Sequence, residues 1–571
     1  MSASNPQLSI ILPAFNEGAH IFANVGKVRE TFLGKRSFEI VVVDDGSPDN
    51  TFAEAGRAAQ QWPEVRAFRQ KHNAGKGEAL KRGFRESRGE RVAFLDADLD
   101  IPPSQVEVLM ATMDRAGADV VIGSKRHPDS NLNYPWHRKV VSYLYYLLIK
   151  LLFGLPLLDT QTGVKLFKRT ALADCFPRIL VKAFAFDIEL LAVLHARGYR
   201  IVDAPVVIEF KGLFGMFGLR AIWDIFENTL AVFYRLRVLR YYDSYQPKTP
   251  PDPLPRVSII IPVKCDNPML QQSLQYCLDL NYPDFEVVVL PDDPFTHGDP
   301  RVRILPTGPM RPAEKRNRGF REATGSIIAF LDDDAYPLPH WLEEAVGNFS
   351  RPEVGAVGGP GLTPPDDPLL ARVSGRIYEA RMISGNYRYR YVVDRMREVD
   401  DFPSCNLIVR KKTLETLGGF GTNYWPGEDT ELCLQITKKL GQKIIYDPRV
   451  EVFHHRRPSL LRHFRQLASY GLHRGSFVRV FPQTSRRLVY FLPSILSLWL
   501  LLGWLSIPLP VIGWLYPTSV TAYLLLAAAS GFSTRPTLFL LTFAGIVCSH
   551  LAYGLSFIRG LLAPVVDAKH S

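Results

Sequence analysis

The sequence is poor in cysteine. Its six cysteines are scattered over 571 residues, and no two of them form a CxxC pair. This spacing favours small, reduced core residues in a cytoplasmic setting over a disulfide framework. The first seven residues are polar and lack the apolar stretch of a secretory signal, so we expect no leader sequence.

Glycine-rich phosphate loops are missing too. The stretch NAGKG at residues 73–77 matches neither a Walker loop nor GxGxxG, so a nucleotide would have to be held in another way. The net charge of +11, from 68 basic and 57 acidic residues, suits an anionic partner such as acidic lipid headgroups or phosphorylated ligands. No motif that reads RNA or DNA accompanies this charge, and we expect no nucleic-acid partner.

The chain contains a long internal repeat. The runs SIILP, VVVDD and AFLDAD of the first half recur in the second half as SIIIP, VVVLPDD and AFLDDD, in the same order and at similar spacing. A repeat of this length indicates a duplicated domain rather than a solenoid unit. We therefore predict domains at residues 1–245 and 256–485, joined by a stiff, exposed, proline-rich linker at residues 246–255.

Each copy alternates short β-branched runs with amphipathic helices. Residues 40–43 and 92–95 are predicted strands buried on both faces, and residues 52–62 and 77–87 are predicted helices. This alternation predicts an α/β fold, with a doubly wound, Rossmann-like and mostly parallel sheet in each domain. Ligands of such sheets bind beyond the carboxyl ends of the strands, where the aspartates of this chain lie.

Long hydrophobic runs occur near the C-terminus. Residues 488–507, 515–532 and 538–558 are almost wholly apolar, and about 20 such residues cross a bilayer. We predict two or three membrane spans within residues 486–562, followed by a tail at 563–571; a buried helical subdomain is the alternative. The arginines before the first span should stay on the cytoplasmic side, which predicts a multi-pass protein of the inner cell membrane with cytoplasmic domains.

Carboxylates follow the predicted strands of the first copy. Asp44 and Asp45 can accept hydrogen bonds from a base and a ribose. Asp96 and Asp98 are spaced to chelate a hard divalent cation, and Asp100 can add a third oxygen. Mg²⁺ or Mn²⁺ at this place would bridge to a diphosphate and neutralise it as it leaves. A solvated acidic turn is the alternative, but the position directly behind a VAFL strand favours the metal site.

With these residues the first copy resembles the family 2 glycosyltransferases of GT-A fold, in particular the dolichyl- or undecaprenyl-phosphate sugar synthases. The resemblance covers about the first 240 residues and is carried by the motifs LPAFNEG, VVVDDGSPDNT, NAGKGEAL, FLDADLDIPP, GSKR, DTQTGVKLFKR and FDIELL. It implies a nucleotide-sugar site formed by Glu17, Asp44, Asp45, Lys76 and Arg126. It also implies a metal site formed by Asp96, Asp98 and Asp100, and an acceptor-phosphate site formed by Arg138 and Lys165.

The same resemblance places Asp159 in the catalytic centre. A lipid phosphate has a second pKa near ~6, so it is largely ionised at neutral pH and needs no strong base. It needs cations that position it and a metal that stabilises the departing nucleotide, so Asp159 would orient those cations rather than take a proton. Residues 140–158 are apolar, and we favour an interfacial helix lining a lipid groove over a membrane span.

The second copy differs at its acceptor end. Glu428 and Asp429 open a predicted helix at residues 430–440, where an acidic pair either caps the helix or offers a base to an acceptor hydroxyl. A sugar hydroxyl has a very high pKa and needs a base, so we predict that Asp429 is catalytic. The other predicted ligands of this copy are Asp292, Asp293 and Asn317 for the nucleotide sugar and Asp332, Asp334 and His455 for the metal.

The second copy resembles membrane-anchored family 2 enzymes of exopolysaccharide assembly, of the succinoglycan type, over about residues 256–562. The motifs are EKRNRGFREATGSIIAFLDDDAYP, PSCNLIVRKKTLETLGGF, GEDTELCLQITKKLG, HHRRPSLLRHFRQLASYGLHRG and SHLAYGLSFIRGLL. One departure is LPDDP in place of VDDGS at the first carboxylate site. Another is the missing QxxRW signature of processive synthases, which favours the addition of single sugars.

Together these features predict a membrane-bound, bifunctional, inverting and metal-dependent glycosyltransferase of the hexosyltransferase class. The first domain would transfer a sugar from a UDP- or GDP-linked donor to a polyprenyl phosphate. The second would transfer a sugar to a hydroxyl in glycolipid or polysaccharide assembly, for example on a lipid-linked saccharide. Alternatively, one domain is active and the other is a binding or scaffold module. For a lipid-carrier translocase, two or three spans are too few to enclose a path.

Overall fold

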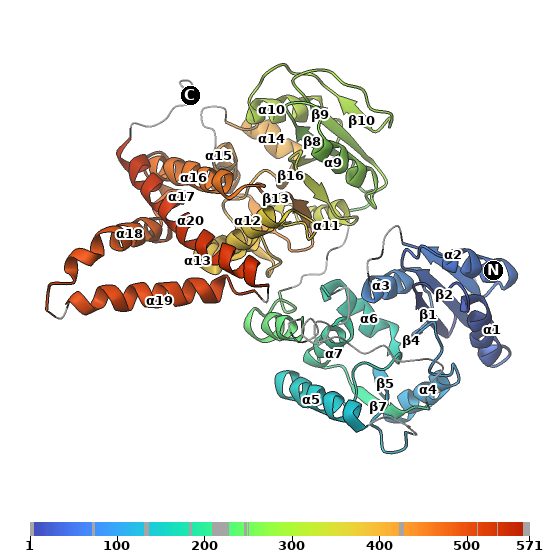
Figure 1. Cartoon of the computed structure of the whole chain (residues 1–571). Helices are drawn as coiled ribbons and strands as arrows, with labels where there is room; N and C mark the ends of the chain where they lie inside the picture. Colours follow the sequence, from blue (N-terminus) through green and yellow to red (C-terminus); the bar gives the residue numbers. More distant parts are fainter. Residues whose placement is uncertain are drawn as a thin grey trace. The chain divides into compact units, whose positions relative to one another are not determined.

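The computed structural model describes residues 5–70, 73, 75–130, 136–181, 185–207, 226, 228–244, 248, 251–421, 427–510, 512–533 and 535–563, without the side chains of 136–142, 144 and 512. The chain divides into two compact units, Met1–Tyr245 and Gln246–Ser571. Each unit is built on a large sheet with helices on both of its faces (Figure 1).

Unit 1 contains a seven-stranded sheet in the order β3-β2-β1-β4-β6-β5-β7. Strand β6 runs antiparallel to β4 and β5, and the other neighbours are parallel. Every residue of β2 is buried because helices cover both faces of the sheet. The strands are β1 (Leu8–Ala14), β2 (Phe38–Asp44), β3 (Val65–Arg69), β4 (Arg91–Leu95), β5 (Val120–Ser124), β6 (Val164–Lys168) and β7 (Ile201–Pro205).

Helices α1, α2 and α4 share one hydrophobic core with the sheet of unit 1. Helix α3 packs against the opposite side of β1, and Gly83 permits the close approach, since a Cβ there would lie 2.3 Å from Cγ2 of Ile11. The helices of unit 1 are α1 (Ile21–Phe32), α2 (Thr51–Gln61), α3 (Lys76–Glu86), α4 (Gln105–Ala116), α5 (Trp136–Phe153), α6 (Arg169–Cys175) and α7 (Phe186–Ala196). The predicted helices at 52–62 and 77–87 thus exist and begin one residue earlier.

Unit 2 has an eight-stranded sheet in the order β10-β9-β8-β11-β16-β13-β17-β15 and a small sheet in the order β12-β18-β14. In the large sheet β16 is antiparallel to β11 and β13, and β15 is antiparallel to β17. Both units therefore have the mixed, mostly parallel sheet that the sequence predicts. The strands are β8 (Val257–Pro262), β9 (Phe285–Leu290), β10 (Val302–Ile304), β11 (Ile327–Leu331), β12 (Ala335–Pro337), β13 (Val354–Gly358), β14 (Gly361–Leu362), β15 (Arg397–Val399), β16 (Asn406–Arg410), β17 (Lys443–Tyr446) and β18 (Val452–His454).

Helices α9, α10, α11, α14 and α15 of unit 2 pack on these two sheets (Figure 1). The described helices before the apolar C-terminal region are α9 (Pro268–Leu278), α10 (Pro312–Glu322), α11 (Trp341–Gly347), α12 (Leu369–Glu379), α13 (Arg381–Ser384), α14 (Lys411–Leu417), α15 (Glu428–Leu434), α16 (Leu460–Val480) and α17 (Pro482–Ser485). The predicted helix at 430–440 is α15 followed by a π-helical turn, Gln435–Lys439.

The duplication extends to buried polar contacts. Ser9 donates a hydrogen bond to the buried Glu39 in unit 1 (2.6 Å), and Ser258 does the same to Glu286 in unit 2 (2.7 Å). Each serine hydroxyl also accepts a backbone N–H from a glycine that precedes β4 or β11. Each glutamate pairs with an arginine of the adjacent strand, β3 or β10. Such a satisfied internal network is retained in both copies because an unpaired buried carboxylate is strongly destabilising.

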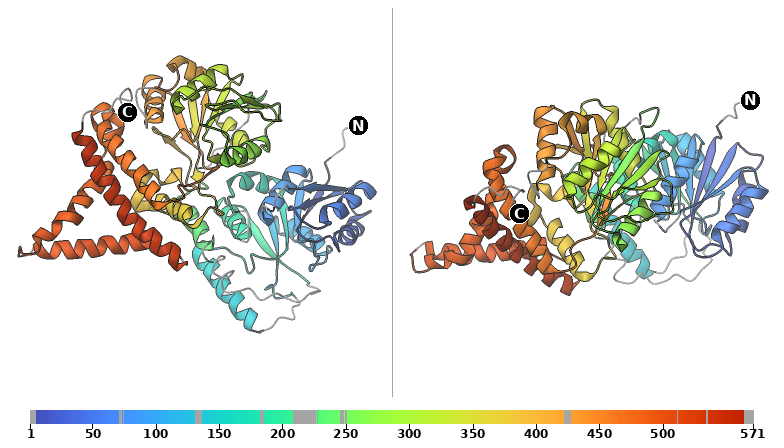
Figure 2. Two further views of the ribbon diagram at one scale, coloured as in Figure 1. Left: turned by 45° about the horizontal axis from the view of Figure 1, so that its top comes forward. Right: turned by 90° about the horizontal axis from the view of Figure 1, so that it is seen from above.

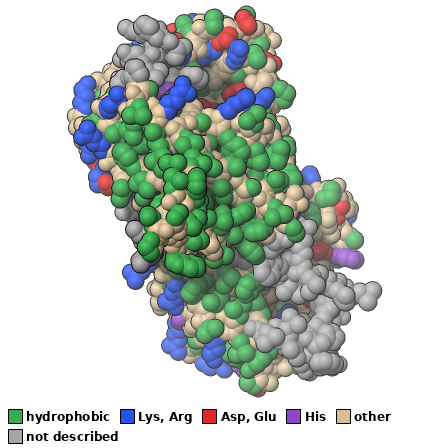
Figure 3. All heavy atoms as spheres, turned by 60° about the vertical axis from the view of Figure 1, so that its left-hand side comes forward, with side chains coloured by type: hydrophobic (Ala, Val, Ile, Leu, Met, Phe, Trp, Pro, Cys, Tyr) green, Lys and Arg blue, Asp and Glu red, His purple; other side chains and the backbone are tan. Residues whose placement is uncertain are grey.

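Three apolar helices end the described chain: α18 (Leu488–Leu502), α19 (Leu515–Ser530) and α20 (Pro536–Leu562). In the described residues, two segments are long and apolar enough to cross a membrane, Leu488–Ser506 and Pro536–Leu562, whereas α19 is shorter and α5 does not qualify. Leu488, Trp514 and Leu525 are more than two-thirds exposed. Figure 3 shows hydrophobic side chains spreading over this face, with lysines and arginines at its border. An exposed apolar surface of this extent is typical of a contact with lipid or with another protein.

Helix α16 lies against α20 along much of its length, as both views of Figure 2 show. Glycines make the contact close. A Cβ on Gly475 of α16 would lie 2.3 Å from the carbonyl oxygen of Phe557, and a Cβ on Gly560 of α20 would lie 2.0 Å from that of Leu472. Side chains larger than hydrogen therefore do not fit, and α16 is held against α20 backbone to backbone.

We expect Gly475→Val to lower the thermal midpoint of unit 2 by about 5 °C, because overpacking of such a contact destabilises by about 2 kcal/mol. Thermal unfolding of the detergent-solubilised chain, followed by circular dichroism, measures the effect. Gly298→Ala is the matched control, since no atom lies within 4 Å of the added Cβ. An unchanged midpoint for Gly475→Val would show that the two helices are not in close contact.

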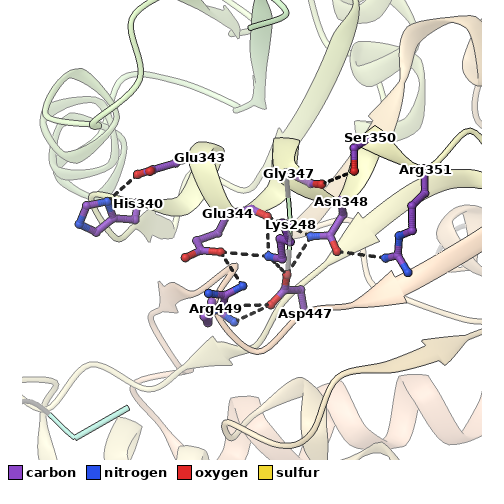
Figure 4. Close-up of polar contacts among 10 residues, drawn as sticks. All are labelled: Lys248, His340, Glu343, Glu344, Gly347, Asn348, Ser350, Arg351, Asp447 and Arg449. Carbon is purple, nitrogen blue, oxygen red and sulfur yellow. Dashed lines mark hydrogen bonds and ion pairs between the residues drawn. The ribbon is translucent and has the colours of Figure 1, made fainter. Parts of the chain in front are cut away.

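The predicted linker is not exposed throughout. The ammonium group of Lys248 lies 3.0 Å from Glu344 and also pairs with Asp447, as Figure 4 shows. Asp447 is fully buried and accepts a further hydrogen bond from Asn348 at 2.8 Å. Arg449 completes the cluster at 3.0 Å from Glu344. The linker is therefore anchored in unit 2 at this residue.

We expect Lys248→Met to destabilise unit 2 by about 2 kcal/mol. The substitution removes one of the two cations beside the buried carboxylate of Asp447 and leaves only Arg449. Burial raises the pKa of Asp447, but the charges of Lys248 and Arg449 outweigh burial and lower it. The stabilisation is present above the pKa of an unfolded Asp and is lost as the pH falls. Urea unfolding at neutral and acidic pH measures it, with the exposed Lys412→Met as control. Equal stability of the two variants at pH 7 would contradict the anchoring role.

Candidate active sites

One cavity of about 740 Å³ lies at the carboxyl end of the large sheet of unit 2. Loops after β11 and β18, the start of α15, and helices α16, α18 and α20 all contribute to its walls. Its lining includes four of the predicted site residues, Asp332, Asp334, Asp429 and His455. Two neighbours that the predictions did not assign, Glu428 and His454, line it as well. The predicted metal ligands and the predicted base, Asp429, therefore line the same cavity.

A group of possible metal ligands lies in this cavity. Ligand atoms of Asp332, Asp334 and His454 all lie within 4.8 Å of one another, and Nε2 of His454 is 3.1 Å from Asp334. The residues meet because β12 and β18 pair antiparallel, which brings the turn after β11 beside the end of β18. Two carboxylates and one imidazole form a donor set that suits Mn²⁺ and is compatible with Mg²⁺.

The sequence predicted His455 rather than His454 as the histidine ligand. In the structure the two ring nitrogens of His455 face Asp367 (2.5 Å) and Gln272 (3.0 Å), away from Asp334. Adjacent residues at a strand end point to opposite sides, so only one of the two histidines can meet Asp334. The geometry therefore favours His454 as the ligand.

Arg316 of α10 is a site residue that the sequence analysis missed. Its buried guanidinium lies 2.8 Å from Asp332 and 3.2 Å from Glu428, and thus connects the metal group to the start of α15. In unit 1 the corresponding carboxylate, Asp96, pairs with Lys76 of α3 at 2.5 Å. When the two helices are aligned on their shared GFRE ending, these cations lie four residues apart, which is one helical turn on the same face.

Asp429 is electrostatically suited to accept a proton. Burial raises its pKa to about 7, and the negative charges of Glu428 and Asp401 add to this effect. The backbone N–H of Thr430 donates to its Oδ1 at 2.8 Å. A carboxylate with a pKa near the operating pH is an effective general base.

The three predicted nucleotide ligands of unit 2 differ in their exposure and in their contacts. Asp292 pairs with the buried Lys315, which also donates to the carbonyl of Val263. Asp293 is exposed. The amide of Asn317 exchanges two hydrogen bonds with the backbone of Phe420, at 2.9 and 2.7 Å, so its observed contacts hold a loop. Nucleotide binding by these three residues stays a prediction.

In unit 1 the carboxylates at the end of β2 hold turns. Asp44 is fully buried, accepts the N–H of Ser47 at 3.1 Å and pairs with Arg69 at 3.2 Å. Asp45 accepts the N–H of Gly75 at 2.8 Å, which ties the loop before α3 to the end of β2.

The acidic group after β4 is close to Glu17. Burial raises the pKa of Glu17, and the charges of Asp98 and Asp100 raise it further. The backbone N–H of Asp100 donates to Asp98 at 3.2 Å. Within the described residues of unit 1, no three such side chains converge as closely as the group in unit 2. Asp96 is paired with Lys76 at 2.5 Å. Metal binding by Asp96, Asp98 and Asp100 stays a prediction.

The remaining predictions for unit 1 concern its acceptor side. Asp159 accepts the hydroxyl of Thr162 at 2.8 Å and the N–H of Lys125 at 3.2 Å. Lys165 is buried and pairs with Asp187 at 2.9 Å, so its ammonium supports the fold. The guanidinium of Arg126 lies 5.0 Å from the ring centre of Tyr146 of α5. The side chain of Arg138 lies outside the described residues.

Comparison with known proteins identifies the family. A profile of glycosyl transferase family 2 matches residues 9–176 and 258–418, which together form more than half of the chain. The chain belongs to glycosyl transferase family 2. The predicted family is thus confirmed, and so is the presence of two copies of its domain.

Several characterised relatives are similar to part of the chain. Glycosyltransferase AglD of Haloferax volcanii is 30% identical over 240 residues, which are 42% of this chain and 38% of AglD. The dolichyl-phosphate beta-glucosyltransferase of Dictyostelium discoideum is 31% identical over 219 residues, 35% of this chain and 66% of that enzyme. The enzyme of the same name from Homo sapiens is 30% identical over 250 residues, 41% of this chain and 76% of that enzyme. The chain therefore spans less than two thirds of the length of the first two relatives.

Solved structures similar to this chain include glucosyl-3-phosphoglycerate synthase from Mycobacterium tuberculosis. Its complexes with UDP and with Mn²⁺, UDP and glucosyl-3-phosphoglycerate are 21% identical to this chain, with a TM-score of 0.32, and cover 40% of it and 79% of the synthase.

Proposed function

We propose that this protein is a membrane-bound, bifunctional, inverting glycosyltransferase. Unit 1 transfers a sugar from a nucleotide sugar to a polyprenyl phosphate, and unit 2 transfers a sugar to the hydroxyl of a second acceptor. The observation that supports unit 2 most directly is the single cavity that contains Asp332, Asp334, His454 and Asp429. For unit 1 the support comes from the motifs of the first 240 residues and from relatives named as dolichyl-phosphate glucosyltransferases.

In the proposed reaction of unit 2, the carboxylate of Asp429 takes the proton of the acceptor hydroxyl. The hydroxyl oxygen forms a bond to the anomeric carbon while the bond from that carbon to the nucleoside diphosphate breaks. Attack on the face opposite the leaving group inverts the anomeric configuration. Arg316 keeps the start of α15 beside Asp332, so the base stays close to the donor.

A divalent ion fits the group of Asp332, Asp334 and His454, and when bound it neutralises the charge of the departing diphosphate. In unit 1 the acceptor is already anionic, so the proposed roles of its residues are binding and orientation rather than proton transfer.

The membrane part of the proposal places α18 and α20 across the bilayer and both units on the cytoplasmic side. Its support is the length and apolar composition of Leu488–Ser506 and Pro536–Leu562. The arginines directly before α18, including Arg486 and Arg487, favour a cytoplasmic start of the first span.

The full chain, purified in nanodiscs, tests the activity of unit 1. It is incubated with undecaprenyl phosphate, Mn²⁺ or Mg²⁺ and, in turn, UDP-glucose, UDP-galactose and GDP-mannose, and the lipids are analysed by mass spectrometry. We expect one donor to yield a glycosylated polyprenyl phosphate. Absence of this product with every donor would overturn the proposal for unit 1.

A further inference from the structure

The cavity of unit 2 continues past the base to the beginning of α18. Arg390, Arg474, Tyr490 and Pro493 line this far end, and Tyr553 of α20 lines it as well. Tyr490 is the third residue of α18, so this part of the cavity lies where the first candidate span begins. We call the two arginines and the carboxylate between them, Asp401, the arginine pair site.

At the arginine pair site, two guanidinium groups share one carboxylate. Oδ2 of Asp401 is 3.3 Å from Nη2 of Arg474 and 3.5 Å from Nη2 of Arg390. Its other oxygen accepts the hydroxyl of Thr430 at 3.0 Å. The side chain of Arg474 is only 17% exposed, that of Arg390 15% and that of Asp401 5%. These three residues together carry a net charge of +1 in a largely buried place. An additional anion would stabilise this unbalanced charge.

Hydrogen bonds and ring contacts fix both arginines. Nη2 of Arg390 donates to the backbone carbonyl of Asp401, and Nη1 of Arg474 donates to the hydroxyl of Ser485 at 3.4 Å. The guanidinium of Arg390 lies 4.7 Å from the ring centre of Tyr387, and that of Arg474 lies 4.7 Å from the ring centre of Tyr490. The two rings stack on each other at 5.9 Å. Contacts through ring faces hold a guanidinium plane without using the N–H groups at its edge. Nε of Arg390 is buried and has no hydrogen-bond partner in the described part of the chain.

Two neighbouring carboxylates, Asp400 and Glu428, are paired with other arginines. Arg487 has its own carboxylate, Asp400, and donates to the hydroxyl of Tyr387 at 2.9 Å. Glu428 is engaged by Arg316 at 3.2 Å. The guanidinium of an arginine offers a fork of N–H donors that matches the oxygens of a phosphate group, so arginines are common phosphate ligands in proteins.

We propose that Arg390 and Arg474 bind the phosphate of a phosphate-linked lipid, which makes the acceptor of unit 2 a saccharide carried on such a lipid. This inference rests on the proposed function, in which α18 starts at the membrane surface and Asp429 activates the acceptor hydroxyl. The phosphate lies at the start of α18, the apolar chain extends along the membrane helices, and the terminal sugar reaches toward Asp429. Free phosphate compounds have the same head chemistry but no chain, and they are the competing source.

Binding of tritiated farnesyl phosphate to the full chain in phosphatidylcholine nanodiscs tests the inference. Unit 1 is also proposed to bind a lipid phosphate, so we expect two sites per wild-type chain. Arg474→Gln leaves Asp401 paired with Arg390 and should remove one site or weaken it at least about tenfold. Arg474→Lys keeps the positive charge but lacks the two parallel N–H donors of a guanidinium, and it should weaken binding at this site less than Arg474→Gln does. Arg487→Gln is the matched control, because Arg487 also contacts Tyr387 but does not line the cavity, and it should retain both sites.

The outcomes separate this inference from the proposed function. If Arg474→Gln and Arg390→Gln both keep the wild-type stoichiometry and affinity, the arginine pair site does not bind phosphate and the inference is wrong. If the wild-type chain has one site and Arg474→Gln has none, the inference holds and the proposal for unit 1 fails. If inorganic phosphate displaces the probe from this site as well as farnesyl phosphate does, a lipid source is excluded and the inference is overturned.

Discussion

Asp334→Asn is expected to abolish one transfer activity of the protein and to leave the other intact, and Asp98→Asn is expected to do the reverse. Asp334 contacts His454 at 3.1 Å and belongs to the proposed metal group of unit 2. Asp98 is its counterpart after β4 of unit 1. Loss of a group that helps to stabilise the departing charge lowers kcat by about 10³-fold.

Two assays on each variant provide the measurement. Formation of glycosylated polyprenyl phosphate reports on unit 1, and incorporation of labelled sugar into larger glycolipids reports on unit 2. Asp129→Asn and Asp366→Asn, at exposed carboxylates of units 1 and 2, are the matched controls and should keep both activities. If Asp334→Asn leaves every transfer at the wild-type rate, unit 2 is a binding or scaffold module and the bifunctional proposal is wrong.

The sheets of both units were predictable because their signal is local. Runs such as residues 40–43 are β-branched and apolar throughout, which is the pattern of a strand covered on both faces, and the structure buries all of β2. The repeat added a second, independent copy of the same pattern. The carboxylates at the strand ends followed from the general rule for ligand sites in such sheets.

The composition of the unit 2 site was only partly predictable. The choice between His454 and His455 depends on where β18 ends and on its antiparallel pairing with β12, which the sequence does not specify. Arg316 meets Glu428 across 112 residues of sequence, and Arg474 meets Asp401 across 73. Long-range pairs of this kind depend on the packing of helices around the sheet, so a reading of local motifs does not find them.

Asp429→Asn is expected to lower kcat of unit 2 by about 10³-fold with little change in KM for the nucleotide sugar. A general base contributes about 10²–10⁴-fold, and an amide cannot accept the proton of the acceptor hydroxyl. Asn is nearly isosteric and keeps an oxygen for the N–H of Thr430, which donates to Asp429 at 2.8 Å in the wild-type chain. Glu431→Gln, on the same helix but outside the cavity lining, is the control and should retain activity.

The pH profile of the wild-type chain gives a second measurement of the same role. Burial and the charges of Glu428 and Asp401 raise the pKa of Asp429 to about 7. Because the base acts only when deprotonated, kcat of unit 2 should rise as the pH increases through about 7 and fall about tenfold per pH unit well below it. Unit 1, whose proposed acceptor phosphate has a second pKa of about 6, should keep its activity to about one pH unit lower. A residual activity of Asp429→Asn above about a tenth of wild type, with the acidic limb still near pH 7, would show that another group takes the proton.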